Sequence, residues 1–91
     1  MNMKQMDLLE EYLKKKGIRY GRACMDKGEQ IVAYSKDGKR LWDAICTRYS
    51  YGHEKGLLEI MGNIVDKKRV GDSVEGWLTA QDVIDRVEGR L

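Results

Sequence analysis

The stretch IVAYSKDGKRLWDAIC at residues 31–46 decides the fold, because two apolar runs flank a short polar segment that contains Asp37-Gly38. Asp-Gly between apolar runs is typical of a β-hairpin whose two-residue type I′ turn places both central residues at positive φ. Such a turn sets the register of the hairpin. The expected pairs are Tyr34 with Leu41, Ala33 with Trp42 and Ile31 with Ala44.

Side chains alternate between the two faces of this hairpin, as in any β-strand. One face carries Ile31, Ala33, Trp42, Ala44 and Cys46. The other carries Val32, Tyr34, Leu41, Asp43 and Ile45. The first face is expected to form the core, since Trp42 offers the largest apolar area. The second is expected to stay partly open, where two copies of the chain could form a homodimer.

The chain before the hairpin predicts a third strand and a helix. Residues 18–25 form a short run that Asp26-Lys27-Gly28 separates from the hairpin, so strands 18–25, 29–35 and 39–48 are expected in an antiparallel meander. Residues 5–16 instead follow helical spacing, with their apolar positions at 6, 9, 12 and 13. Three lysines at 14–16 precede Gly17, which suits a helix C-terminus.

The chain after the hairpin predicts two more helices. Apolar residues at 57, 58, 60, 61, 64 and 65 follow one helix face, which favours a helix over 54–65, although Gly62 weakens it and a strand is the alternative. The polar segment 66–72 is expected to be an exposed, mobile loop. Thr79 followed by Asp82 is typical of a helix start and predicts a final helix over 80–90.

Together these segments predict one α+β domain over residues 1–91, with elements in the order α-β-β-β-α-α. A three-stranded antiparallel meander would be packed on one face by helices. The residues expected in its core are Leu9, Leu13, Ile31, Trp42, Ala44, Leu58, Met61, Ile84 and Val87.

The composition excludes several classes of protein. The chain has 17 Lys+Arg against 15 Asp+Glu, and its net charge of +2 is too small to indicate a nucleic-acid or membrane partner. No apolar run approaches the roughly 18 residues of a membrane span, and the first residues lack the features of a signal peptide. Two cysteines, Cys24 and Cys46, are then typical of reduced thiols in the cytoplasm. Whether they lie close together depends on the strand pairing.

Motifs for catalysis or for cofactor binding are missing from the sequence. It contains no glycine-rich phosphate loop, no nucleophile elbow and no metal-ligand spacing among Cys24, Cys46 and His53. His53 is the single histidine, and nothing in the sequence orients its imidazole beside Cys46. We therefore expect no catalytic residue, no metal and no cofactor, in a protein that is not an enzyme.

Residues 47–53, TRYSYGH, have the most unusual local composition of the chain. Such a segment can contact a protein, stack on nucleic-acid bases, or simply pack under the next element. The near-neutral charge favours a protein partner. The alternative is weak nucleic-acid binding by this segment together with Lys39 and its neighbours at the hairpin tip. The candidate partner-binding residues are Lys36, Arg40, Arg48, Tyr49, Tyr51 and His53.

Three segments carry a resemblance to known proteins: LWDA at 41–44, YSYGHEKGLLEIMG at 49–62 and DSVEGWLTAQDV at 72–83. Over roughly residues 41–87 the chain resembles small, functionally uncharacterised proteins of Firmicutes phages and mobile elements. The resemblance implies a bacterial or phage setting in the cytoplasm. Small accessory phage proteins often bind and block a host factor, so it also implies a possible inhibitor of a host defence nuclease, of the anti-CRISPR kind.

Overall fold

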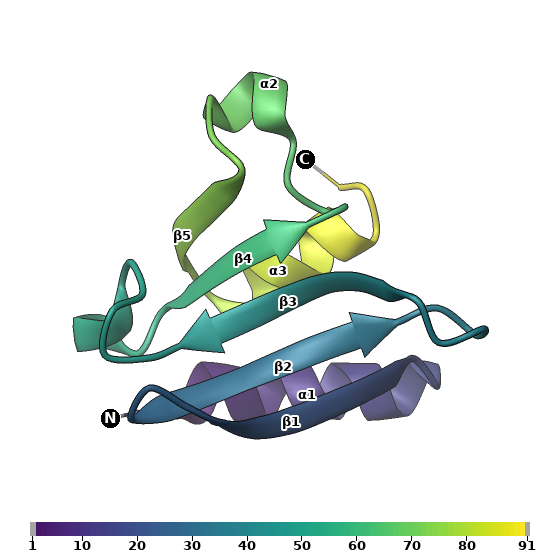
Figure 1. The fold of residues 1–91 in the computed structure, drawn as a ribbon, viewed down its shortest axis with the longest axis horizontal. Coiled ribbons are helices and arrows are strands. Elements are labelled where there is room, and N and C mark those ends of the chain that lie inside the picture. The colour runs from purple at the N-terminus through teal and green to yellow at the C-terminus, as the bar shows by residue number, and fades with distance from the viewer. Residues whose placement is uncertain (1, 91) are drawn as a thin grey trace.

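The computed structural model describes residues 2–90, which form an α+β domain. Its elements are α1 (Lys4–Lys16), β1 (Arg19–Met25), β2 (Gly28–Tyr34), β3 (Arg40–Cys46), the 3₁₀ turn η1 (His53–Lys55), β4 (Leu58–Gly62), α2 (Lys67–Val70), β5 (Val74–Leu78) and α3 (Ala80–Val87). The strands form one antiparallel sheet in the order β1-β2-β3-β4-β5. Figure 1 shows this sheet in front of α1 and α3, so the predicted α+β class, with helices on one face of an antiparallel meander, is confirmed. The meander has five strands where three were predicted, because β4 and β5 extend it beyond β3.

The core lies between the sheet and these two helices. Met6, Leu9 and Leu13 of α1 are fully buried, as is Val83 of α3. The face of the hairpin expected to be buried is buried, and of the predicted core residues Ile84 and Val87 are half-buried against it. Met61 was predicted to be in the core, but it is 49% exposed. Within residues 2–90, no helix combines the length and apolar character needed to cross a bilayer.

Helix α1 confirms the helix expected over 5–16 and ends in a Schellman motif. Gly17 adopts φ +69, its N–H donates to the Lys14 carbonyl, and the N–H of Ile18 donates to the Leu13 carbonyl. The helix is tied to the sheet by Arg22 of β1, whose guanidinium pairs with Asp7 and Glu10 of α1 at 2.9 Å and with Glu29 of β2. These ion pairs connect α1, β1 and β2 in the N-terminal part of the chain.

The predicted turn type at Asp37-Gly38 is wrong, although most of the register is right. Gly38 has φ +89 but Asp37 does not have positive φ, and Tyr34 pairs with Arg40 instead of Leu41. A longer loop closes this hairpin, with the Gly38 N–H donating to the Ser35 carbonyl, and a β-bulge absorbs the extra residue. The two-residue turn with both φ values positive instead joins β1 to β2, at Asp26 and Lys27.

The helix predicted over 54–65 is also wrong. Its first residues form only η1, which ends at Gly56 with φ +69, and the following residues form β4 between β3 and β5. Leu58 and Ile60 alternate toward the helices and are at most 1% exposed. Hydrogen bonding to two strands and this buried pair outweigh the helical spacing. Strand β4 therefore places Met61 on the open face of the sheet.

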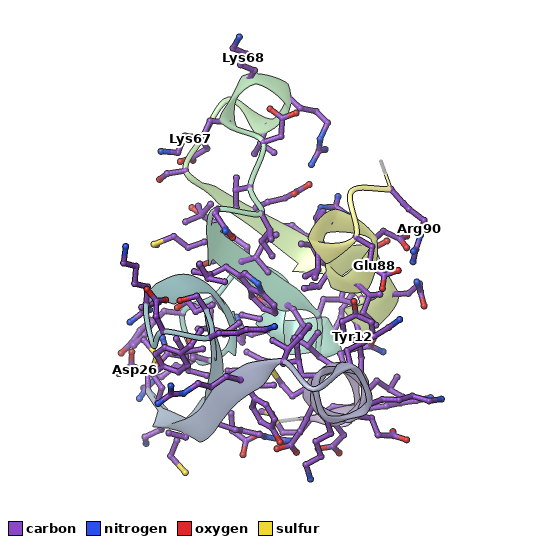
Figure 2. All side chains as sticks on the ribbon, turned by 90° about the vertical axis from the view of Figure 1, so that its right-hand side faces the viewer. Tyr12, Asp26, Lys67, Lys68, Glu88 and Arg90 are labelled. Atoms are coloured by element: carbon purple, nitrogen blue, oxygen red, sulfur yellow. The ribbon has the colours of Figure 1, made fainter. Side chains whose placement is uncertain are left out.

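Two further differences concern the C-terminal third. Segment 66–72, expected to be a loop, contains the short helix α2, because the Asp66 carboxylate accepts hydrogen bonds from the N–H groups of Lys68 and Arg69. Residues 74–78 form β5, the edge strand. In Figure 2 the side chains of Lys67 and Lys68 project from α2 away from the sheet. Helix α3 starts as predicted, with a capping box between Thr79 and Asp82, but ends at Val87 before Gly89 adopts φ +73.

Candidate functional site

The loop between β3 and β4 is held by its own hydrogen bonds. The N–H of Thr47 donates to Ser50 Oγ at 2.9 Å, and Ser50 Oγ donates to the Thr47 carbonyl at 3.1 Å. Both residues are 2% exposed. The His53 N–H donates to the Ser50 carbonyl, and the Leu57 N–H donates to the Gly52 carbonyl. The buried polar groups of this loop are thus paired, and both of its tyrosines are among the side chains left exposed.

Tyr51 anchors this loop to the edge strand β5. Its carbonyl accepts from the Trp77 N–H at 3.2 Å, and its N–H donates to Glu59 Oε1 on β4 at 3.0 Å. The contact with β5 is so close that a Cβ on Gly76 would lie 2.4 Å from the Tyr51 Cβ. Gly52, with φ +96, also lies close to this strand, since a Cβ there would be 3.1 Å from the Trp77 Cα. Glycine is required at both positions for the loop to reach the strand.

A β-bulge places Trp77 beside Tyr51. Leu58 pairs with Leu78 and Ile60 with Glu75, so Gly76 and Trp77 together oppose Glu59. Trp77 has φ +62, a conformation that costs a residue with a side chain about 1 kcal/mol. Its indole is nevertheless 55% exposed. The fold therefore holds a large aromatic residue in a strained conformation without burying it.

Tyr51, Met61 and Trp77 form what we call the aromatic surface. Tyr51 is 58% and Met61 49% exposed, and Met61 lies two residues, or about 7 Å along the strand, from Glu59. Tyr49, 73% exposed, stands in the same loop as Tyr51. Aromatic residues and methionine are enriched at protein interfaces, where they supply apolar contact area. The aromatic surface therefore has the composition of a contact site.

The predicted site residues in the loop have different environments. The Arg48 guanidinium stacks over the Tyr49 ring, 5.7 Å from its centroid, and both side chains are exposed. His53 is half-buried, and its Nδ1 lies 2.6 Å from the Ser50 carbonyl and 3.3 Å from Glu54. These contacts orient the imidazole toward its own loop. Of the predicted loop residues, Tyr51 is thus the one in direct contact with β5.

The two predicted site residues of the hairpin lie elsewhere. Lys36 is at the tip and Arg40 opens β3, whereas the loop follows the other end of the same strand, about 20 Å away (Figure 1). Arg40 Nη2 also pairs with Asp43 at 3.0 Å, and Gln30 donates to the same carboxylate. The structure therefore does not bring the hairpin cations and the tyrosines together.

Beneath the aromatic surface, Glu75 ties β5 to α3. Its carboxylate accepts from Arg86 Nε and Nη2 at 2.7 and 2.8 Å and from Arg69 Nη2 at 2.9 Å, and the Glu75 side chain is 13% exposed. The Arg86 hydrogen bonds hold the pKa of the Glu75 carboxyl below its ordinary value, against the opposing effect of burial and with help from Arg69. This pairing braces the strand that carries Trp77.

The two cysteines do not form a pair. Cys24 on β1 and Cys46 on β3 both lie opposite Glu29 on the strand between them, so they are two strand spacings, or about 10 Å, apart. That separation exceeds the reach of a disulfide. Burial raises the pKa of the Cys46 thiol. Among residues 2–90, no group of three His, Cys, Asp or Glu side chains is placed to hold a metal ion.

Sequence reasoning missed Trp77 and assigned Met61 to the core. A signal for Met61 was present, because Leu58 and Ile60 alternate with Glu59 and Met61 as in a strand. For Trp77 the signal was weaker: Gly76 next to a bulky residue is compatible with a bulge. Tyr51 and Trp77 are far apart in sequence. Their contact depends on the strand order, which brings β5 next to β4 and the loop before it.

The fold and this surface define a class: a small α+β domain with a five-stranded antiparallel meander, two helices on one face of the sheet, and exposed aromatic residues in the β3–β4 loop and on β5. No protein-family model, curated protein or solved structure matches the chain.

Proposed function

We propose that this chain is a small, non-enzymatic binding protein of the cytoplasm whose aromatic surface contacts a protein partner. The observation that carries the proposal is Trp77, which is strained at φ +62 and yet 55% exposed. Such a residue adds little to the stability of the fold, because the free energy gained by burying it is too small to offset its backbone strain. Backbone strain of this kind concentrates at functional sites.

The neighbours of Trp77 support a protein as the partner. Tyr51 is held against Gly76 and bound to the Trp77 N–H, and Met61 lies on the adjacent strand opposite Val74, so the three exposed apolar side chains belong to one hydrogen-bonded frame. Pre-organised aromatic side chains lose little entropy on binding, which favours them as anchors. In the phage setting that the sequence resemblance implies, the partner would be a host factor, such as a defence nuclease that the chain blocks.

Binding to nucleic acid is the other outcome to be tested. It would need cations that follow a phosphate backbone. Arg48 beside Tyr49 is suited to stacking, but Arg40 is paired with Asp43, and the hairpin tip lies at the far end of β3. These contacts favour the protein partner.

The experiment compares matched variants in capture from a lysate of the bacterial host after nuclease treatment. Trp77→Gly and Tyr51→Ala should each lose the captured protein, whereas Leu8→Ala should retain it, because Leu8 is a 42% exposed apolar residue on α1. Trp77→Gly is also expected to be at least as stable as wild type in urea unfolding, since glycine adopts φ +62 without strain. Loss of binding without loss of stability separates a contact role from a structural one.

Three results would oppose the proposal. Equal capture by all variants would exclude the aromatic surface, and a marked loss of stability in Trp77→Gly would make Trp77 a structural residue. Salt-sensitive binding of oligonucleotides that is lost with Arg48→Gln would favour nucleic acid instead. Sedimentation of wild type and Met61→Lys in parallel tests whether a second copy covers the open face, as expected from sequence.

A further inference from the structure

A hollow of about 410 Å³ opens at the hairpin end of the molecule. It lies where α1 ends, β1 begins and the β2–β3 hairpin turns, and it is closed by the segment after β4 and by Val87 at the end of α3. Sites for small organic ligands have volumes of roughly 300–1,000 Å³. The hollow is therefore large enough for a compact organic molecule.

The walls of the hollow are largely apolar. They include Ile18, Leu41, Trp42, Ile64 and Val87. Trp42 is 4% exposed, so its ring is held by the core and forms a fixed surface. Ile18 is fixed as well, because its N–H closes the Schellman motif at the end of α1. A ring or short chain placed in this hollow would contact walls that are already ordered, which reduces the entropic cost of binding.

Three cations stand around the same hollow: Lys16, Arg19 and Lys36. The lining contains no aspartate or glutamate. Within residues 2–90, Arg19 and Lys36 make no ion pair, and the Arg19 guanidinium instead rests beside Gly38. Two carboxylates lie near these cations: Asp37, which accepts from Ser35 Oγ at the hairpin tip, and Glu88, which is 3.8 Å from Lys16 and also bound by Tyr12 and Arg90 (Figure 2). The three cations of the lining outnumber them. The charge at this mouth is therefore positive.

We propose that the hollow binds a small organic anion: one carboxylate, sulfonate or phosphate group attached to an apolar ring or chain. The apolar part would lie against Trp42 and Leu41, and the anionic group would be held at the mouth by Arg19 and Lys36. Both parts are required. The apolar walls supply contact area for the ring or chain, and the cations supply the charge partner for the anionic group, while Tyr34, Ser35 and Asn63 add polar atoms to the lining.

This inference does not rest on the proposed protein contact. Tyr51 and Trp77 lie toward the Cys46 end of β3, Met61 lies opposite Asp43 in the middle of the strand, and none of these three residues lines the hollow. A ligand in the hollow and a partner on the aromatic surface could be bound together. Either proposal can fail while the other stands.

The test uses two fluorescent probes with nearly the same rings, anilinonaphthalene sulfonate with an anionic group and N-phenylnaphthylamine without one. Wild type should bind the anionic probe more tightly, with a shift of the Trp42 indole N–H resonance in a nitrogen–proton correlation spectrum. The double variant Arg19→Gln/Lys36→Gln should bind the anionic probe roughly tenfold more weakly and the neutral probe unchanged. Inorganic phosphate at the same concentrations should not move the Trp42 resonance.

The matched control is Lys67→Gln/Lys68→Gln, which removes two cations that project from α2 and do not line the hollow (Figure 2). It should bind both probes as wild type does. An equal loss in the control would attribute the effect to net charge and overturn the proposal. So would equal affinity for the two probes, or an unmoved Trp42 resonance. Tyr51→Ala serves as a second control, because anionic-probe binding that depends on Tyr51 would place the probe on the aromatic surface.

Discussion

The two ends of β3 differ in how they expose apolar side chains. Beyond Cys46, a loop with paired backbone groups is fastened to a bulge in β5, and Tyr51 and Trp77 are left outside. At the Arg40 end, Leu41 and Trp42 line a hollow whose mouth carries cations. The loop end exposes apolar side chains on a rigid surface, and the hairpin end lines a hollow with them.

This difference follows from where glycine allows backbone segments to approach. At the loop end, Gly52 and Gly76 let two segments touch, which closes the space between them and pushes the aromatic rings outward. At the hairpin end, Gly62 lets β4 cross close to Trp42, after which the chain departs toward α2 and leaves the hollow. Protein partners suit the first arrangement and small ligands the second.

The largest expected effect is at the hairpin end. Gly62→Ala would place a Cβ 2.5 Å from the Leu41 carbonyl oxygen at φ +115, so we expect a loss of about 4 kcal/mol from strain and overlap together. Gly38→Ala is the control, since its φ is also positive but its nearest neighbour is the flexible Arg19 side chain. It should cost about 1 kcal/mol. Urea unfolding measures both, and equal losses would mean that Gly62 matters through φ alone.

The second largest effect is expected at the loop end, where a substitution would disrupt the contact between Tyr51 and β5. Gly76→Ala should cost about 2 kcal/mol, because its Cβ would overlap that of Tyr51. Tyr51→Gly removes the overlapping atom, so the double variant should recover much of the loss in a double-mutant cycle. Gly21→Ala on β1, with no atom within 4 Å and no positive φ, should change stability little. An additive cycle would show that the contact between Tyr51 and β5 is not the cause.

The third prediction concerns acid. Because the pKa of Glu75 is lowered in the folded state, mainly by Arg86, the unfolded chain binds the extra proton first as the pH falls. The stability from this pair is therefore fully present above the ordinary pKa near 4.5 and is lost as pH falls through the lowered value. Glu75→Gln should cost roughly 2 kcal/mol at neutral pH and flatten the acid limb. Glu11→Gln, on the exposed face of α1, should leave that limb as in wild type.

The smallest effect is expected in alkali, at the junction of α1 and α3 beside the hollow. Burial and a 2.7 Å hydrogen bond to Glu88 raise the pKa of Tyr12 to about 12, from an ordinary value of 10.0. Because the unfolded chain loses this proton first, stability should decline between pH 10 and pH 12. Tyr12→Phe should reduce this slope, and what remains should come in part from Tyr20, whose hydrogen bond to Glu10 also raises its pKa. A Tyr12 phenol that titrates in the folded protein near pH 10 would contradict the assignment.

The parts of the fold that sequence predicted are those governed by neighbours in the chain. Helix α1 needs only its apolar spacing and Gly17, and the β2–β3 pairing of Ala33 with Trp42 needs only a short connection. Residues 54–65 were mistaken for a helix because their apolar positions satisfy helical spacing, while the pairing that makes them β4 comes from β3 and β5. The candidate site was half predicted for the same reason: Tyr51 is conspicuous in its own segment, but its neighbour Trp77 is brought to it by the sheet.

By itself, the sequence determined an α+β domain, its first helix, its central hairpin and the buried face that carries Trp42. These depend on periodicity and turn residues, which act over a few positions. The tertiary structure alone decided that five strands pair, that Trp77 is strained and exposed beside Tyr51, and that cations from α1, β1 and the hairpin share one hollow. Each of these joins residues far apart in the chain, and their contact energies exist only after the strands have taken their order.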